Sequence, residues 1–226
     1  MKAIICKIDQ ALKGLYSIDL VYQAQDFLVE NIPTKPTLVI GNKWMGNGAL
    51  LIEEEEHPEH ALSVGIYLNQ TIQAELSSFD QWPKKCWSLL QISAFAIAAE
   101  EVSHFNYLLF NALAGRSVSQ LELEFQAEVD KFLLTYFANI GWSQWDKKTF
   151  THLFEQFFIK FSISTEISPG QKERYVQASQ LAKGLVLRFE KYLSNRFLYE
   201  KAFRLLRRFY RLSVADKISF VNSLQE

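Results

Sequence analysis

The sequence predicts a predominantly helical α+β fold, in which a small N-terminal three-stranded antiparallel sheet is followed by a multi-helix bundle. Before residue 69, short apolar runs are separated by glycine-rich or charged connections. After it, apolar residues recur at helical spacing to the end of the chain. Because the strands cluster early and the helices late, an α+β arrangement is expected and not a βαβ alternation.

Residues 1–68 are expected to hold one helix and the sheet. Apolar residues with loose helical spacing predict a helix from Ile8 to about Val29, and Pro33 and Pro36 then end the segment. Three short apolar runs follow and predict the antiparallel strands. These runs are residues 37–40, 49–52 and 61–68.

Residues 69–226 are expected to form the helical bundle. Asn69 suits an N-cap, and Ser168 precedes a proline at the first helical position and a glutamine at the third. No repeat or linker divides the chain, so we expect a single domain over residues 1–226. The expected helices are 70–79, 86–114, 119–139, 146–163, 169–194, 199–211 and 214–224.

Composition indicates a folded protein of a reducing compartment. Hydrophobic residues make up 49% of the 226 residues, which is enough for a large core. Two cysteines cannot build a disulfide framework, and the N-terminus lacks the apolar segment of a signal peptide. The longest nearly uncharged stretch, 86–99, is shorter than the roughly 20 residues that span a membrane. We therefore expect a cytoplasmic protein without membrane insertion.

The most unusual pattern is Glu100-Glu101-x-x-His104, inside a long and otherwise apolar helix. Carboxylates on a mostly buried helix need partners, because an isolated buried charge is strongly disfavoured. Glu101-x-x-His104 resembles one half of the paired motif of ferritin-like di-iron bundles. A second pair in that order does not occur in the helical region, where the nearest substitute, His152-x-x-Glu155, is reversed.

A mononuclear metal site is one hypothesis for this pattern. The next helix carries Glu124 and Glu128, and Glu128 is expected to approach His104 because a short connection makes the two helices antiparallel neighbours. The predicted metal ligands are Glu101, His104, Glu128 and Glu100, and the metal would be one divalent ion of iron, manganese or zinc. The alternative is that Glu100, Glu101 and His104 form the polar side of an amphipathic helix, or pair with Arg116 and Lys131 in a structural network.

Two glycine-rich or acidic loops are interpreted as ordinary connections. Residues 41–48 lack the ending of a phosphate-binding loop and precede a strand-like run. Residues 53–60 combine acidic residues with two histidines but lack the spacing of a closed zinc site. The dense aromatic residues from Phe132 to Phe161 are expected to fill the core, with an apolar ligand cavity or a partner surface as alternatives.

The C-terminal third is basic, with ten Lys or Arg against three Asp or Glu between Lys183 and Lys217. Arg204, Arg207, Arg208 and Arg211 are the candidate residues for binding a partner or phosphate. The first functional hypothesis is therefore a helical interaction protein that binds a protein partner or itself. A metal-dependent enzyme is the alternative, and a nucleic-acid binder that uses the basic helix is the third.

Overall fold

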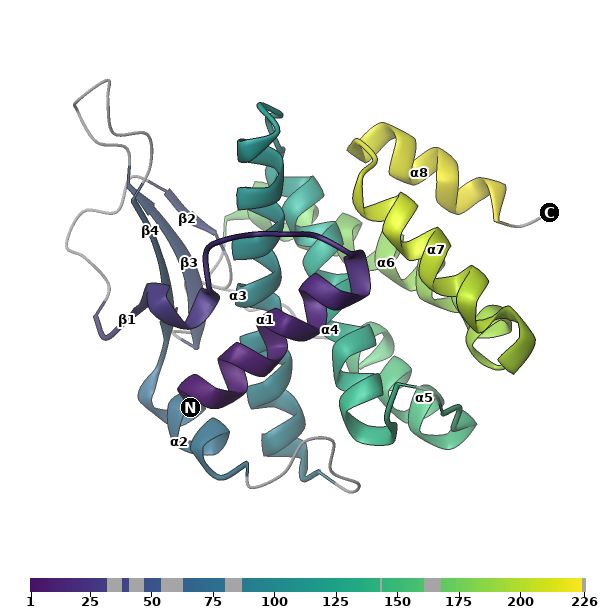
Figure 1. Cartoon of the computed structure of the whole chain (residues 1–226), viewed down its shortest axis with the longest axis horizontal. Coiled ribbons are helices and arrows are strands. Elements are labelled where there is room, and N and C mark those ends of the chain that lie inside the picture. The colour runs from purple at the N-terminus through teal and green to yellow at the C-terminus, as the bar shows by residue number, and fades with distance from the viewer. Residues whose placement is uncertain are drawn as a thin grey trace.

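The computed structural model describes residues 1–31, 38–40, 47–53, 63–79, 87–142, 144–160 and 168–224. These residues form a predominantly helical structure with one small mixed sheet, as Figure 1 shows. The helices are α1 Lys2–Tyr16, α2 Gln70–Ser77, α3 Leu89–Leu113, α4 Gln120–Ile140, α5 Lys147–Phe154, α6 Pro169–Leu193, α7 Tyr199–Tyr210 and α8 Val214–Ser223. Shorter turns are the 3₁₀ segments Ala24–Phe27 and Arg196–Leu198 and the π-helical turn Glu155–Ile159.

The sheet has the strand order β1-β4-β3-β2. Its strands are β1 Leu28–Val29, β2 Leu38–Ile40, β3 Gly48–Glu53 and β4 Ser63–Leu68. The three expected strands are present and pair antiparallel, but the prediction of a purely antiparallel sheet is wrong, because β1 adds parallel to β4. The sheet is therefore mixed.

The N-terminal helix is shorter and earlier than predicted. It ends at Tyr16, and Ser17 adopts the left-handed conformation with φ 49°. The apolar residues that follow, such as Leu20, are buried from a non-helical segment that leads into β1. A helical spacing of apolar residues therefore continued past the point where the helix stops.

The predicted helices after Asn69 are confirmed, with small shifts at their ends. The Asn69 side chain accepts a hydrogen bond from the Ile72 N–H, and Ser168 forms a capping box with Gln171. The helix expected at 146–163 is shorter, because α5 ends at Phe154 and a π-helical turn continues to Ile159.

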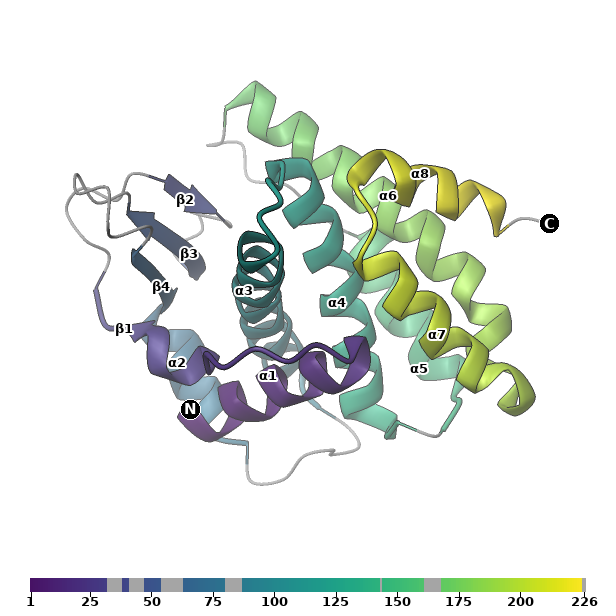
Figure 2. The ribbon, with the colours of Figure 1, turned by 45° about the horizontal axis from the view of Figure 1, so that its top comes forward.

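Helix α4 forms the centre of the molecule. Figure 2 shows α3 between the sheet and α4, with α6 and α7 on the other side of α4. Every residue from Glu122 to Ile140 is buried, so α4 is covered on all sides. Its charged side chains must therefore find partners inside the protein.

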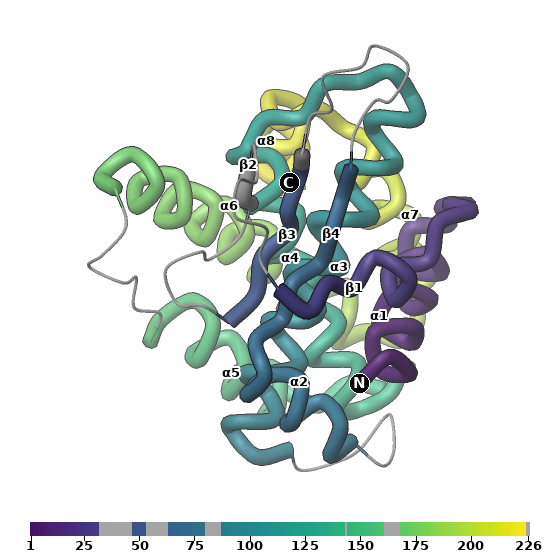
Figure 3. Tube along the Cα trace, turned by 90° about the vertical axis from the view of Figure 1, so that its left-hand side faces the viewer, coloured from purple at the N-terminus to yellow at the C-terminus, as the bar shows by residue number. Residues whose placement is uncertain are grey.

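Strand β3 approaches α3 closely at Gly48. A Cβ atom at this position would lie 2.9 Å from Ile97 Cγ2 and 3.0 Å from Glu101 Cγ, so a larger residue would push the strand away. Figure 3 shows the sheet in front of α3 and α4. The sheet thus covers the side of α3 that carries Glu101.

The aromatic residues after Phe132 pack on one another. The Phe132 ring centroid lies 5.1 Å from that of Phe150 and 5.6 Å from that of Phe158. Within the described residues, no helix is both long and apolar enough to cross a membrane.

Candidate functional site

His104 lies on α3 and is completely buried between two carboxylates. Its Nδ1 is 3.4 Å from Glu101 Oε2, one turn earlier on the same helix. Its Nε2 is 3.5 Å from Glu124 Oε2 on α4. The imidazole therefore lies between carboxylates of two helices.

Lys131 joins two further carboxylates beside this histidine. Its Nζ donates to Glu100 Oε2 at 3.0 Å and to Glu128 Oε1 at 2.5 Å. We call the whole set the acid-rich cluster. It consists of Glu100, Glu101, His104, Glu124, Glu128 and Lys131.

The acid-rich cluster holds four carboxylates against one lysine and one histidine. Burial raises the pKa of Glu101 to about 7, although its contact with His104 favours the ionised form. Burial also disfavours the His104 imidazolium, but Glu101 and Glu124 outweigh that effect and raise the pKa of His104 well above its ordinary value. Burial likewise raises the pKa of Glu128. The cluster therefore tends to bind positive charge.

Two buried atoms of this cluster have no hydrogen-bond partner among the described residues. They are His104 Nε2 and Glu128 Oε2. Buried polar atoms are nearly always hydrogen-bonded in folded proteins, so each exception needs an explanation. The carboxylate oxygen of Glu124 that faces His104 Nε2 is 3.5 Å away, beyond the usual hydrogen-bond distance.

The structure brings together most of the residues predicted from the sequence, with one exchange. Glu101 meets His104 as expected, but Glu124 contacts the histidine whereas Glu128 contacts Lys131. Glu124 and Glu128 are one turn apart on the same helix face, so the sequence pattern could not separate them. The packing register of α3 against α4 determines which of the two glutamates contacts His104.

The structural network predicted as the alternative, in which the acids pair with Lys131 and Arg116, is present in part. Lys131 pairs with Glu100 as anticipated. Arg116 lies elsewhere and donates to Glu122 Oε1 at 2.5 Å and to the Tyr107 hydroxyl at 2.9 Å. As the side chains stand, the described residues contain no group of three or more His, Cys, Asp or Glu that could hold a metal ion.

A second buried polar network lies on another face of α3 and α4, and we call it the saturated network. Asp130 accepts hydrogen bonds from Tyr16, from Ser103 at 2.6 Å and from Gln126 at 2.9 Å. The network also includes Asp9, which accepts from Lys13 and Asn106.

Lys217 closes the saturated network from α8. This fully buried ammonium donates to Gln126 Oε1 at 2.5 Å and lies 4.3 Å and 4.5 Å from the ring centroids of Tyr107 and Phe209. Burial lowers the pKa of Lys217 to about 7, against the opposing effect of Glu122 and Asp130. No local pattern in the sequence distinguishes Lys217 from the exposed residues beside it.

The predicted arginine surface on α7 divides into two pairs. Arg207 donates to the Leu15 carbonyl at 3.1 Å, and Arg211 donates to the Tyr16 and Ser17 carbonyls, each at 3.0 Å. These two residues cap the C-terminus of α1. Arg204 and Arg208 are exposed, and a partner-binding role for them stays a prediction.

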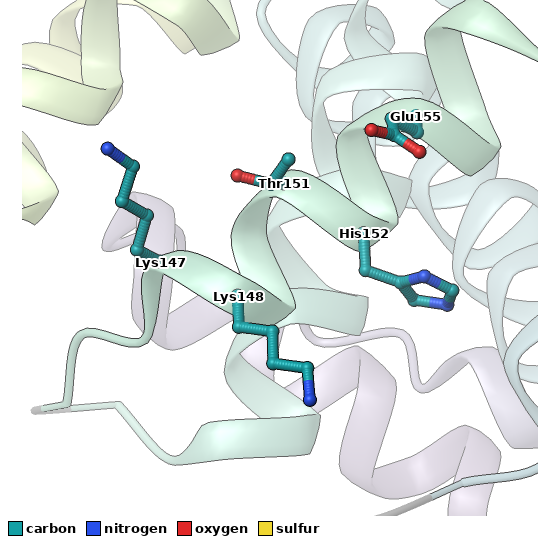
Figure 4. Close-up of a pocket in the computed structure, with 5 residues that line it drawn as sticks. All are labelled: Lys147, Lys148, Thr151, His152 and Glu155. Carbon is teal, nitrogen blue, oxygen red and sulfur yellow. The ribbon is translucent and has the colours of Figure 1, made fainter.

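A shallow hollow on α5 carries the reversed pair His152-x-x-Glu155. Figure 4 shows that the two lysines extend away from each other and that the His152 ring points away from both. These side chains do not converge on a common point. The hollow is lined by Lys147, Lys148, Thr151, His152 and Glu155.

The two loops that the sequence singled out lie mostly outside the described residues, which omit 41–46 and 54–60. Comparison of the chain with protein-family models, with curated proteins and with solved structures gave no match. The function must therefore be inferred from the side chains of the site itself.

Proposed function

We propose that this chain is a divalent-metal-dependent hydrolase, with the metal bound by His104, Glu124 and Glu100. The observation that supports this proposal best is the environment of His104 Nε2. This nitrogen is buried, has no hydrogen-bond partner among the described residues and faces a carboxylate of a second helix. A divalent cation between the two would satisfy both groups.

The contact on the other side of the ring also favours metal binding. Histidines that bind metals usually donate their second ring N–H to a carboxylate, which fixes the tautomer and orients the ring. Glu101 Oε2 lies at this position, 3.4 Å from Nδ1. In the metal-free protein a proton on the imidazole replaces the metal, so metal binding should release protons.

Glu100 is the candidate for the third ligand. It lies one turn before His104 on the same face of α3, and its side chain is 14% exposed whereas that of Glu124 is 2% exposed. Lys131 engages Glu100 Oε2, so Oε1 must turn towards His104 for the metal to bind. The partial exposure of Glu100 would let water complete the coordination.

The register of these residues supports hydrolytic chemistry. In helices with the pattern His-Glu-x-x-His, the first and last residues bind zinc and the glutamate is the general base. This chain has the same register with glutamate at the first position. A bound metal would lower the pKa of its water, and Glu101 would accept the proton after releasing His104 Nδ1.

Metal content is the direct test of this proposal. Purified protein should bind about one Mn²⁺ or Zn²⁺ per chain by elemental analysis and titration calorimetry. His104→Gln and Glu124→Gln should each weaken binding by at least about 100-fold, because each removes a direct ligand and the loss of an outer-shell partner alone costs about 10- to 100-fold. His152→Gln on α5 and Glu173→Gln on α6 are matched controls, since both positions are exposed and should bind as the wild type.

Catalysis is tested with the Glu101→Gln variant. It should keep its metal but lose metal-dependent hydrolysis across a panel of peptide, ester and phosphoester substrates, because the amide cannot accept the proton. A correctly folded wild-type protein that binds neither metal would overturn the proposal. Equal metal binding by the wild type and by His104→Gln would also overturn it.

A further inference from the structure

Lys131 occupies a position that has the features of a cation site. Its ammonium lies between Glu100 Oε2 at 3.0 Å and Glu128 Oε1 at 2.5 Å, and its side chain is only 10% exposed. The second oxygen of Glu128 is buried and has no hydrogen-bond partner among the described residues. Two carboxylate oxygens of two helices therefore meet at one buried position that holds a single positive charge, and the unpartnered Glu128 Oε2 belongs to one of these carboxylates.

The charges of the acid-rich cluster limit the number of divalent ions it can hold. With His104 neutral and all four acids ionised, the carboxylates carry four negative charges and Lys131 carries one positive charge. One divalent metal then leaves the cluster with one excess negative charge. A second divalent metal would have to share the oxygens of Glu100 and Glu128 with the Lys131 ammonium, and two neighbouring cations in a buried site repel each other strongly.

We propose that Lys131 stands in the place of a second divalent cation and thereby restricts the cluster to one metal. This inference rests on the proposed metal site at His104. Glu100 links the two positions, because one of its oxygens pairs with Lys131 while the other is assigned to the metal. Lys131 is thus a positioning residue that sets the metal stoichiometry.

The experiment counts Mn²⁺ ions per chain, since an oxygen-rich position suits this hard cation. The wild type should bind one Mn²⁺, and Lys131→Met should bind two. Lys131→Arg keeps the charge and should bind one. Lys131→Gln provides a second neutral variant that hydrogen-bonds to the carboxylates, in case the methionine variant does not fold.

The double variant His104→Gln/Lys131→Met separates this inference from the proposed function. It should bind one Mn²⁺, at Glu100 and Glu128, because only the position of the lysine remains available. If the wild type binds none and Lys131→Met binds one, the proposed function fails and the limit of one metal fails with it, whereas the assignment of Lys131 to the place of a cation is supported. A folded Lys131→Met or Lys131→Gln protein with the same number of Mn²⁺ ions as the wild type would overturn the inference.

Discussion

Helices α3 and α4 carry two buried polar networks on different faces, and the two networks are built in opposite ways. In the saturated network, Asp130 accepts three side-chain hydrogen bonds and Asp9 pairs with Lys13. In the acid-rich cluster, the two contacts of His104 are 3.4 Å and 3.5 Å long, and two buried atoms find no hydrogen-bond partner in the part of the chain that the structure describes. The saturated network leaves one such atom, Asn106 Oδ1.

This difference separates a structural network from a candidate site. Both networks are buried and both contain charged groups, so neither burial nor charge distinguishes them. The distinction lies in whether the protein itself supplies the partners. A network whose carboxylate oxygens all accept hydrogen bonds needs no ligand, whereas an excess of buried carboxylates gains stability from an added cation.

The largest expected effect comes from removing the central acid of the saturated network. Asp130→Ala should lower the free energy of unfolding by about 3–5 kcal/mol, because Tyr16, Ser103 and Gln126 lose their acceptor inside the protein. Glu128→Ala is the matched change on the same helix. Measured without metal, it should cost about 1 kcal/mol or less, because Lys131 keeps Glu100 and repulsion among the acids decreases.

Urea unfolding at pH 7.5 in the presence of a chelator measures both variants. Similar losses in the free energy of unfolding for the two substitutions would show that the acid-rich cluster stabilises the fold as much as the saturated network does. The distinction between a structural network and a candidate site would then be wrong.

The second-largest expected effect is the pH dependence of the free energy of unfolding in the metal-free protein. Burial raises the pKa of Glu101 from its ordinary 4.5 to about 7. Between these two pH values, the carboxyl group keeps its proton in the folded state but has lost it in the unfolded state. The stability that this proton contributes is fully present below pH 4.5 and is lost as the pH rises to 7. The loss is on the order of 3 kcal/mol.

Glu101→Gln should remove this loss, because the amide does not titrate. Asp130 titrates in the same direction, since burial raises its pKa to about 6. Comparing the two proteins between pH 6 and pH 7 therefore isolates Glu101. Parallel stability curves for wild type and variant over this interval would contradict the assignment.

Much of the helical fold follows from local signals that the sequence displays. Capping side chains such as Ser168, together with the 3.6-residue spacing, locate the helices after Asn69 to within a few residues. Strand β1 could not be predicted, because two residues carry no periodicity and their pairing with β4 depends on contacts distant in sequence. The end of α1 was missed because apolar residues continue beyond Ser17.

The candidate site was predictable only as far as one helix determines it. Glu101 and His104 are one turn apart, so helix geometry alone places them together. The choice of Glu124 over Glu128 depends on how α4 packs on α3. The burial of Lys217 depends on α8 docking against both helices, which no local pattern encodes.

The smallest expected effect concerns the arginines of α7, which tie α1 to the rest of the saturated network. Arg211 donates to the Tyr16 carbonyl, and the Tyr16 side chain donates to Asp130. Arg211→Ala should lower the free energy of unfolding by about 1–2 kcal/mol, because the carbonyls at the end of α1 lose a charged donor. Arg204→Ala, an exposed change on the same helix, should alter it by less than about 0.5 kcal/mol.

Thermal and urea unfolding of the two arginine variants provide the measurement, and metal titration provides the second readout. Arg211 lies on the side of the saturated network, so its loss should leave the affinity for Mn²⁺ unchanged. A fall in metal affinity for Arg211→Ala would show that the two networks are coupled through α3 and α4. The acid-rich cluster would then depend on the saturated network, and the two faces would act as one unit.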